Sequence, residues 1–371
     1  ATTRFVLSKY EKTPVGHLPR PDAMMQVKGQ QTEKEGKSMS VSLMDCTLRD
    51  GANVVGKGFS AEITDMVLDG LTACHVPIIE FGNAGGIGAY EVAGFTNAET
   101  DQTYLNVAQK YLNRGSRLGM FLNAKRYQEK NVSLAKESGL SFLRVGADAG
   151  DGDIAVQAIH DIKKAGLKAF YSAMKAYLLT PDQLAEEGKM LEQEGLDEIT
   201  IMDSAGTMLP DQVAEYTRKL AQAVSIPVAF HCHNNLGLSA ANAVVAYENG
   251  AAILDCGLMG MARSAGNLAT ELCVAIMHRY GQMQDIDLYG MLDFIDQRLQ
   301  PAMDAHNYHN PVTPLDLVLG LSGCHSSLLK KFKAVAEEHQ VNLYQLIVEV
   351  SARDQKSPSD ELMAKTAAAL Q

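Results

Sequence analysis

Apolar and polar positions alternate in a regular way along most of the chain. From residue 41 onward, eight short apolar or β-branched runs each lead into a polar turn, a pattern typical of strands. The stretches between these runs carry apolar residues at a helical period. The predicted strands are Val41–Leu48, Val76–Phe81, Arg117–Leu122, Phe142–Val145, Lys168–Ser172, Glu198–Met202, Val228–His233 and Ala252–Cys256. The predicted helices include Ala61–Ala73, Glu99–Leu112, Asp153–Ala165, Pro181–Glu194, Pro210–Val224 and Ser239–Asn249.

This alternation of strands and helices predicts an α/β fold with a parallel sheet, because each return to the same sheet edge needs a crossover. Eight units without a long interruption favour a closed TIM (β/α)8 barrel. Glycines precede several predicted strands, at Gly139, Gly166, Gly195 and Gly250, where a left-handed residue would end the preceding helix. A doubly wound open sheet is the alternative fold.

The two ends of the chain differ from this repeating region. Residues 1–40 are largely polar and lack a sustained apolar period, so we interpret them as an N-terminal extension. The barrel is expected over residues 41–281. Residues 282–371 are expected to form a small helical C-terminal domain that caps the barrel or mediates assembly. The clearest helical segments in this tail are Leu288–Leu299, Ser326–His339 and Leu343–Glu349.

Composition narrows the possible partners. The 371-residue chain has a formal net charge of -11 and a pI near 5.4, so we expect no nucleic-acid partner. No apolar run reaches the roughly 20 residues that a membrane helix needs, so no membrane association is expected. The six cysteines form no CxxC pair, which favours buried, reduced thiols in a cytoplasmic enzyme.

Polar and ionisable residues follow several predicted strands. The active sites of TIM barrels lie at the carboxyl ends of the strands. We therefore expect these residues to gather at one rim of the barrel. They fall in Thr47–Gly51, Glu80–Asn83, Arg144–Gly146, Met202–Gly206, His231–Asn235 and Ser264–Asn267.

The pair His231 and His233 predicts a metal site. Residues two apart on a strand point to the same face, so two imidazoles can converge on one ion. Asp50, after the first predicted strand, would supply a carboxylate opposite them. Two histidines and one carboxylate leave coordination positions open for a substrate, which suits a catalytic metal. The alternative is two unrelated histidines, one of them capping a helix.

Arg49 and Glu80 are the other candidate catalytic residues. A guanidinium is always charged and presents a planar fork, which suits a carboxylate or an enolate oxygen. Glu80 on the next strand would orient Arg49. The alternatives are an ordinary surface ion pair for Arg49 with Asp50 and a solvated charge for Glu80. Gly85–Gly88 is not interpreted as a dinucleotide loop, because the GxGxxG spacing is missing.

Together these residues resemble the superfamily of metal-dependent aldolases and lyases whose barrel carries an Asp-Arg-Glu triad, which includes the HMG-CoA lyases and the isopropylmalate and homocitrate synthases. The triad here would be Asp50, Arg49 and Glu80. The resemblance implies that Asp50, His231 and His233 are metal ligands, that Asn267 is a further ligand, and that Arg49 stabilises an enolate. The matching stretches are Thr47–Gly51, His231–Leu238, Ala241-Asn242 and Gly266-Asn267.

Within this group the chain resembles above all the 4-hydroxy-2-oxovalerate aldolases. The segment Met202–Met208 is similar to the sixth strand of that family, and the tail resembles its C-terminal helical domain. Two departures concern the catalytic base. The family carries a histidine where this chain has Asn53, and a neutral amide cannot take up a proton at a useful pKa. Family tyrosines in the tail are replaced by Leu321 and His325.

We therefore expect His325 to act as the general base, because a histidine is missing near the first strand and one has been gained in the tail. The alternative for His325 is an exposed histidine at the start of the predicted helix Ser326–His339. The remaining substrate contacts are expected from Arg49, Asn53, Asp203 and Ser204.

The resemblance implies a divalent-metal-dependent carbon-carbon lyase that cleaves a 4-hydroxy-2-oxo acid to pyruvate and an aldehyde. Mn2+ is the expected ion, with Mg2+ or Co2+ as alternatives. A homodimer is expected, with an acylating aldehyde dehydrogenase as a further partner. The alternative functions are a Claisen-type acyl-CoA lyase or synthase of the same superfamily, and a non-catalytic barrel subunit.

Overall fold

Eight parallel strands form a closed barrel in the chain order β1 to β8. The structure is a computed structural model that describes residues 40–371 except 93–97, 310–312, 323, 325–327 and 355–357. Closure between the first and last strands confirms the TIM barrel and excludes the doubly wound sheet. The strands are β1 (Ser42–Asp45), β2 (Ile78–Phe81), β3 (Arg117–Asn123), β4 (Phe142–Asp148), β5 (Lys168–Met174), β6 (Glu198–Asp203), β7 (Val228–Cys232) and β8 (Ile253–Cys256).

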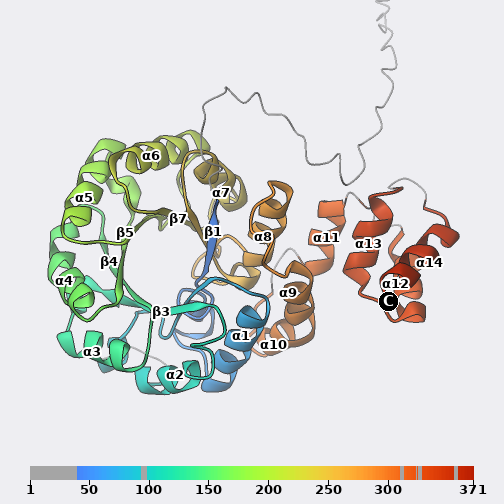
Figure 1. The fold of residues 1–371 in the computed structure, drawn as a ribbon, viewed down its shortest axis with the longest axis horizontal. Coiled ribbons are helices and arrows are strands. Elements are labelled where there is room, and N and C mark those ends of the chain that lie inside the picture. The colour runs from blue at the N-terminus through green and yellow to red at the C-terminus, as the bar shows by residue number, and fades with distance from the viewer. Residues whose placement is uncertain (1–39, 93–97, 310–312, 323, 325–327, 355–357) are drawn as a thin grey trace, which may run out of the picture.

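Helices form an outer ring around the strands (Figure 1). They are α1 (Ala61–Ala73), α2 (Asp101–Ala108), α3 (Glu129–Glu137), α4 (Val156–Lys164), α5 (Pro181–Gln193), α6 (Pro210–Ala223), α7 (Ser239–Glu248) and α8 (Thr270–Arg279). The predicted segments for α1, α5, α6 and α7 agree with these bounds to within one residue. The structure adds α3, which the apolar pattern did not single out because few of its side chains are apolar and buried.

After α8 the described residues contain helices and no further strand. α11 to α14 lie to one side of the barrel, where α11 packs against α8 (Figure 1). The predicted helix Leu288–Leu299 passes through a π-helical turn at Ile295–Leu299 just before Pro301, whose ring nitrogen cannot donate a helical hydrogen bond. The helices are α9 (Leu288–Phe294), α10 (Gln300–Asp304), α11 (Pro314–Ser322), α12 (Leu329–His339), α13 (Leu343–Ser351) and α14 (Asp360–Ala369).

The predicted first strand is longer than the strand in the structure. β1 ends at Asp45, because the carbonyl oxygen of Cys46 accepts the N–H groups of Arg49 and Asp50 at 3.0 and 2.8 Å. This tight turn places the side chains of Arg49 and Asp50 at the mouth of the barrel. Four glycines that were predicted to end helices, at 139, 166, 195 and 250, have φ between +77° and +112°.

The barrel interior is layered. Its lower layer, at the amino ends of the strands, is mainly apolar and includes the stacked rings of Phe142 and Phe170, with centroids 4.6 Å apart. Gly119 makes room for this layer, because a Cβ there would lie 2.5 Å from the ring of Phe142. The inward positions two residues further along β2, β4 and β8 are instead charged: Glu80, Arg144 and Asp255. A buried charged layer therefore supports the barrel mouth.

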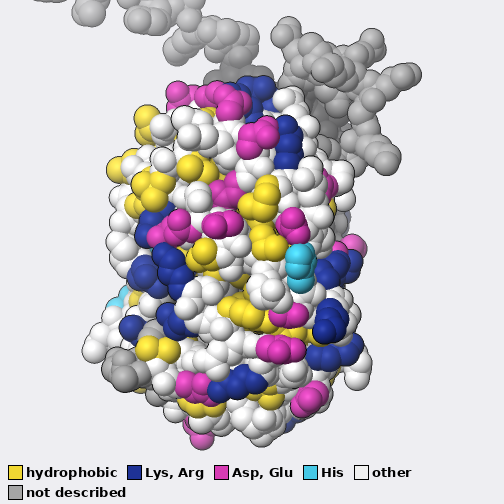
Figure 2. Space-filling view, turned by 90° about the vertical axis from the view of Figure 1, so that its left-hand side faces the viewer, with side chains coloured by type: hydrophobic (Ala, Val, Ile, Leu, Met, Phe, Trp, Pro, Cys, Tyr) yellow, Lys and Arg dark blue, Asp and Glu magenta, His cyan; other side chains and the backbone are white. Residues whose placement is uncertain are grey.

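The outer surface mixes charges of both signs. Figure 2 shows the side of the barrel that carries α4 and α5, where Lys and Arg lie among Asp and Glu side chains. Pairs such as Lys163 with Asp197 and Lys189 with Glu186 produce this intermingling. Among the described residues, no helix combines the length and the apolar character that crossing a membrane requires.

Candidate active site

Asp50, His231 and His233 lie together at the mouth of the barrel. Nε2 of His231 is 3.7 Å from Oδ2 of Asp50, and Nε2 of His233 is 3.6 Å from the same oxygen. All three side chains are buried. One candidate ligand atom from each falls into a group compact enough to hold a metal ion. The structure thus brings together the three residues that were predicted as metal ligands.

His233 lies directly after β7, where two other loops of the barrel mouth pack against it. β7 ends at Cys232, one residue short of the predicted strand, and His233 forms an isolated antiparallel bridge with Asn267. The loop after β6 packs closely beneath it at Gly206, where φ is +59° and a Cβ would lie 2.5 Å from the carbonyl oxygen of His233. Only glycine satisfies both the left-handed backbone and this close approach.

Two carboxylates hold Arg49 beside this cluster. Nη1 of Arg49 lies 3.1 Å from Oδ1 of Asp50, and Nε donates to Oε2 of Glu80 at 2.6 Å. The guanidinium carbon is 5.2 Å from the centroid of the Phe121 ring. Arg49 is 5% exposed and Glu80 is 0% exposed, so neither is a surface charge. Nη2 of Arg49 has no hydrogen-bond partner among the described residues, which leaves one buried donor available in the site.

Arg144, in the middle of β4, extends this network into the barrel. Its Nε donates to Oε1 of Glu80 at 2.8 Å, and its Nη2 donates to Oε2 at 2.6 Å. Its Nη1 donates to Oδ2 of Asp255, and that same oxygen lies 3.3 Å from Nδ1 of His231. The contacts therefore form a chain of ionisable groups that starts and ends at the predicted metal ligands: Asp50, Arg49, Glu80, Arg144, Asp255 and His231.

The expectation that Arg144 lies at the rim is wrong. β4 continues to Asp148, so Arg144 sits below the mouth with no solvent exposure. Sequence reasoning gave Arg144 no specific role in the site and did not single out Asp255. A signal was available, because a charged residue in the middle of an apolar strand needs a buried partner. Asp255 stands between Leu254 and Cys256 in this way.

The neighbouring charges determine the ionisation of these carboxyl groups. Burial acts to raise the pKa of Asp50, but Arg49 and the two imidazoles outweigh it and hold the pKa below its usual range. Burial is likewise outweighed at Glu80 by Arg144 and Arg49, so its pKa is lowered. The pKa of Asp255 is lowered against burial by Arg144. These three carboxyl groups are therefore ionised at neutral pH.

The residues present fit a divalent cation. Three carboxylates face two guanidinium groups, which leaves one net negative charge among these five buried groups. Burial lowers the pKa of His233 to about 4, so this imidazole is neutral and able to act as a ligand at neutral pH. Oδ1 of Asn267 is also buried without a hydrogen-bond partner among the described residues.

Asn53 and Asn267 both contact Asp50. Nδ2 of Asn53 donates to the backbone oxygen of Asp50 at 2.8 Å and lies 3.3 Å from its Oδ1. Nδ2 of Asn267 donates to Oδ2 of Asp50 at 2.9 Å. These amides orient the carboxylate. Substrate contact by Asn53 and metal ligation by Asn267 stay predictions.

Asp203 and Ser204 are engaged in holding loops. Oδ1 of Asp203 accepts the N–H of Thr207 at 3.0 Å, and Oδ2 accepts that of Met208 at 2.9 Å. Oγ of Ser204 accepts the N–H of Lys175 at 2.9 Å. The described geometry therefore gives both residues a structural role, and their contact with substrate stays a prediction. His325, the predicted general base, lies outside the described residues.

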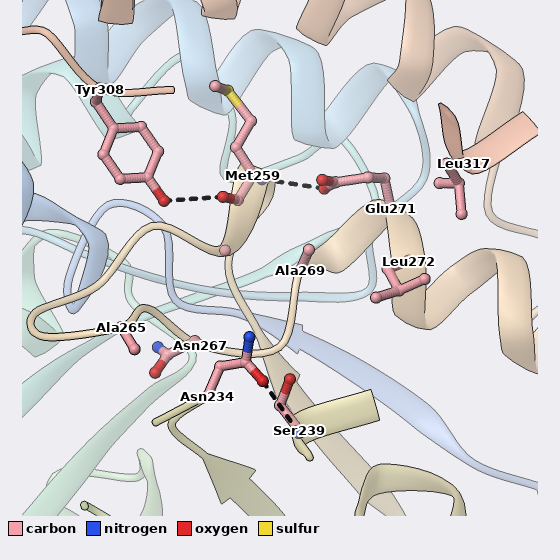
Figure 3. Close-up of a pocket in the computed structure, with 11 residues that line it drawn as sticks. Asn234, Ser239, Met259, Ala265, Asn267, Ala269, Glu271, Leu272, Tyr308 and Leu317 are labelled. Atoms are coloured by element: carbon pink, nitrogen blue, oxygen red, sulfur yellow. Dashed lines mark hydrogen bonds between the residues drawn. The ribbon is translucent and has the colours of Figure 1, made fainter. Parts of the chain in front are cut away.

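A cavity of about 100 Å3 adjoins the site at Asn267 (Figure 3). Its wall is completed by the C-terminal region, since Tyr308 donates to the backbone oxygen of Met259 at 2.9 Å and Leu317 of α11 lines it. Glu271 accepts the N–H of Met259 at 3.0 Å. Asn267 therefore belongs both to the Asp50 cluster and to a cavity that the helices after the barrel help to form.

Comparison with known proteins identifies one family over most of the chain. The profile of the HMGL-like family matches residues 40–297. A 4-hydroxy-2-oxovalerate aldolase of Moorella thermoacetica is 31% identical over 330 residues, which is 88% of this chain and 96% of that protein. One from Pectobacterium atrosepticum is 32% identical over 306 residues, covering 81% and 87% of the two chains. The hydroxymethylglutaryl-CoA lyase structure from Pseudomonas aeruginosa superposes with a TM-score of 0.62 at 18% identity, covering 76% of this chain and 98% of that chain.

Proposed function

Because the chain belongs to the HMGL-like family, we propose that it is a divalent-metal-dependent aldolase that cleaves a 4-hydroxy-2-oxo acid into pyruvate and an aldehyde. The similarity to relatives named 4-hydroxy-2-oxovalerate aldolase supports the reaction class. The observation that carries the proposal is the cluster of Asp50, His231 and His233, beside which Nη2 of Arg49 has no partner among the described residues.

The proposed reaction breaks the C3–C4 bond of the substrate. A base takes the proton of the 4-hydroxyl group, C4 becomes the aldehyde carbon, and the bonding electrons pass through C2 to its oxygen as an enolate. Protonation at C3 then gives pyruvate. A divalent ion held by Asp50, His231 and His233 would supply Lewis acidity that stabilises the enolate charge.

Arg49 supplies the protein's own positive charge in this mechanism. Its Nη2 is buried and lacks a partner among the described residues, so it can donate to the oxygen on which charge develops. Glu80 holds the same guanidinium through Nε. The donor is therefore in place before the reaction, and no side-chain rearrangement reduces its effect.

The proton acceptor is assigned to His325 on sequence grounds. Among the described residues, the histidines that contact Asp50 are His231 and His233, which the proposal uses as ligands. Asn53 cannot serve as a base. His325 therefore remains the proposed base, with Arg49 and Glu80 as the other catalytic groups.

The proposal also covers the cellular location, the domains, the assembly and the resident ion of the enzyme. All six cysteines are buried and none is in a disulfide among the described residues, which supports a cytoplasmic location. We propose an N-terminal extension over residues 1–40, a catalytic barrel over 41–281 and a helical domain over 282–371. A homodimer, an acylating aldehyde dehydrogenase partner and Mn2+ as the resident ion complete the proposal. Light scattering of the purified chain and elemental analysis test the oligomer and the ion.

The activity is tested with 4-hydroxy-2-oxopentanoate as substrate. Pyruvate release is followed through NADH oxidation by lactate dehydrogenase, with and without a chelator and with Mn2+ added back. We expect turnover that the chelator abolishes and Mn2+ restores. Turnover only with an acyl-CoA substrate would favour the Claisen-type alternative. Absence of turnover with either substrate would favour a non-catalytic subunit.

A further inference from the structure

We infer that Asp255 is a positioning residue for the proposed metal centre, where it fixes the imidazole of His231 through the Nδ1 edge. This inference rests on the proposed function, because it concerns how one of the ligands is held. Asp255 itself is not placed among the ligands. Its relation to His231 is that of an outer partner that orients an inner one.

The barrel register places these two side chains next to each other. His231 on β7 pairs with Asp255 on β8, and in a parallel ladder paired residues point to the same face of the sheet. Both side chains point into the barrel interior, with exposures of 2% and 1%. Asp255 is the one acidic side chain within ion-pair distance of Nδ1 of His231 among the described residues, at 3.3 Å, where the two atoms are close but their angle is not that of a formed hydrogen bond.

This contact selects the tautomer that a ligand needs. A neutral imidazole carries one N–H donor and one acceptor nitrogen. A carboxylate beside Nδ1 favours the proton on that nitrogen, which leaves the lone pair on Nε2. Nε2 is the atom that faces Oδ2 of Asp50. Without a carboxylate at this position, nothing in the described site would favour the binding tautomer.

Asp255 is itself held by Arg144. The guanidinium contacts Oδ2 of Asp255 through Nη1, and its Nη2 lies 3.3 Å from Sγ of Cys46. Cys46, His231 and Asp255 form a second group compact enough for a metal ion. The cation of Arg144 already occupies this side of the group, so Asp255 pairs with a guanidinium here, and the ion is expected on the Asp50 side.

The same scaffold holds the proposed enolate donor. Glu80 accepts from Arg144 through both oxygens and from Arg49 through Oε2. A displacement of Asp255 would therefore be transmitted to Arg144 and Glu80 as well as to His231. The positions of one ligand and of the donor at Arg49 depend on one buried arginine.

The decisive variant is Asp255→Asn, which keeps the shape of the side chain but removes its charge. Mn2+ affinity of the purified apoprotein is measured by calorimetry. Losing an outer partner of a ligand typically costs about 10- to 100-fold in metal affinity, and we expect a loss of that size. Glu198→Gln is the control for replacing a buried carboxyl group by its amide elsewhere in the barrel interior. Glu198 is another 1%-exposed carboxyl group of the barrel interior, hydrogen-bonded to Thr200 and without contact to His231. It should change the Mn2+ affinity less than threefold.

The tautomer of His231 is the second readout. Nitrogen-15 NMR of labelled histidine distinguishes the two tautomers, and His231→Gln assigns the signal. In the metal-free wild type we expect the Nδ1–H form, and in Asp255→Asn a shift toward the Nε2–H form. A folded Asp255→Asn variant with wild-type Mn2+ affinity and an unchanged tautomer would overturn the inference.

The wild-type spectrum keeps the inference testable even when Asp255→Asn does not fold, because an Nε2–H tautomer there would overturn it. Failure of the wild type to bind Mn2+ at all would instead contradict the proposed function. The two failures are therefore distinguishable.

Discussion

Glu80 holds the guanidinium of Arg49 at Nε and leaves its Nη2 donor available. Oε2 of Glu80 accepts from Nε at 2.6 Å, while Nη2 of Arg49 has no partner among the described residues. Because both side chains are buried, this ion pair lies in a low-dielectric environment and strongly restricts the guanidinium. A planar side chain fixed in this way can present one donor in a defined direction.

Arg49→Lys tests whether that donor contributes to catalysis. Lysine keeps the charge but cannot contact Glu80 and present a second donor in a fixed geometry. We expect kcat to fall about 100- to 1000-fold, the usual effect of losing one donor to a developing oxyanion. The coupled pyruvate assay measures turnover, and calorimetry with Mn2+ checks that the metal is retained. A variant within a few-fold of wild type would show that Arg49 is structural.

His233→Ala should remove the metal. Its Nε2 is one of two imidazole nitrogens facing Oδ2 of Asp50, and a three-ligand site does not tolerate the loss of one ligand. We expect at least about a tenfold lower metal affinity, because even outer partners have effects of that size. Elemental analysis after dialysis provides the measurement. The control is His160→Ala on the exposed face of α4, and equal metal content in both variants would exclude His233 as a ligand.

Glu80→Gln should destabilise the fold. Removing its charge leaves Arg49 and Arg144 with a missing buried partner, which typically costs about 3–5 kcal/mol. Urea unfolding measures this free energy. Lys189→Ala breaks the exposed pair with Glu186 and should cost no more than about 1 kcal/mol. Similar losses in the two variants would mean that the buried network contributes little.

Glu198→Gln should stabilise the protein, increasingly so as the pH rises. Burial raises the pKa of Glu198 from 4.5 to about 8. Below pH 4.5 the carboxyl group is neutral in both the folded and the unfolded chain, so its ionisation does not change the free energy of unfolding. Between pH 4.5 and pH 8 the carboxyl group ionises in the unfolded chain but stays neutral in the folded chain. This difference lowers the free energy of unfolding of the wild type by at most about 1.4 kcal/mol per pH unit. The variant's advantage in free energy of unfolding over the wild type, measured with urea, should be larger at pH 8 than at pH 5.5. A difference that does not depend on pH would contradict the raised pKa.

His325→Asn tests the proposed base. Loss of a general base typically lowers turnover about 100-fold or more. An unperturbed imidazole titrates near pH ~6.5, so wild-type activity should rise with pH through that region. The variant should lose both the activity and this acidic limb while binding Mn2+ normally. A normal pH profile would make Asp203 the next candidate.

The sequence determined the repeating architecture and the chemistry at the strand ends. Period-two and helical apolar patterns depend on neighbours close in sequence, so the eight strands could be located from residue order alone. The helix-ending glycines follow from backbone sterics, which are also local. The resemblance of Asp50, His231 and His233 to a metal site needed only their residue types and their places after predicted strands.

Only the tertiary structure decided how the charged residues pair. Asn267 contacts Asp50 across 217 positions because β1 closes against β8, and Arg144 reaches Asp255 across 111. Alternation along one strand predicts that a side chain points inward, but it does not predict which residue faces it from another strand. The structural role of Asp203 could not be predicted for the same reason, because its two hydrogen bonds to loop N–H groups depend on how the chain turns after β6. Buried charges are stable only when paired, and these pairs exist only once the barrel has closed.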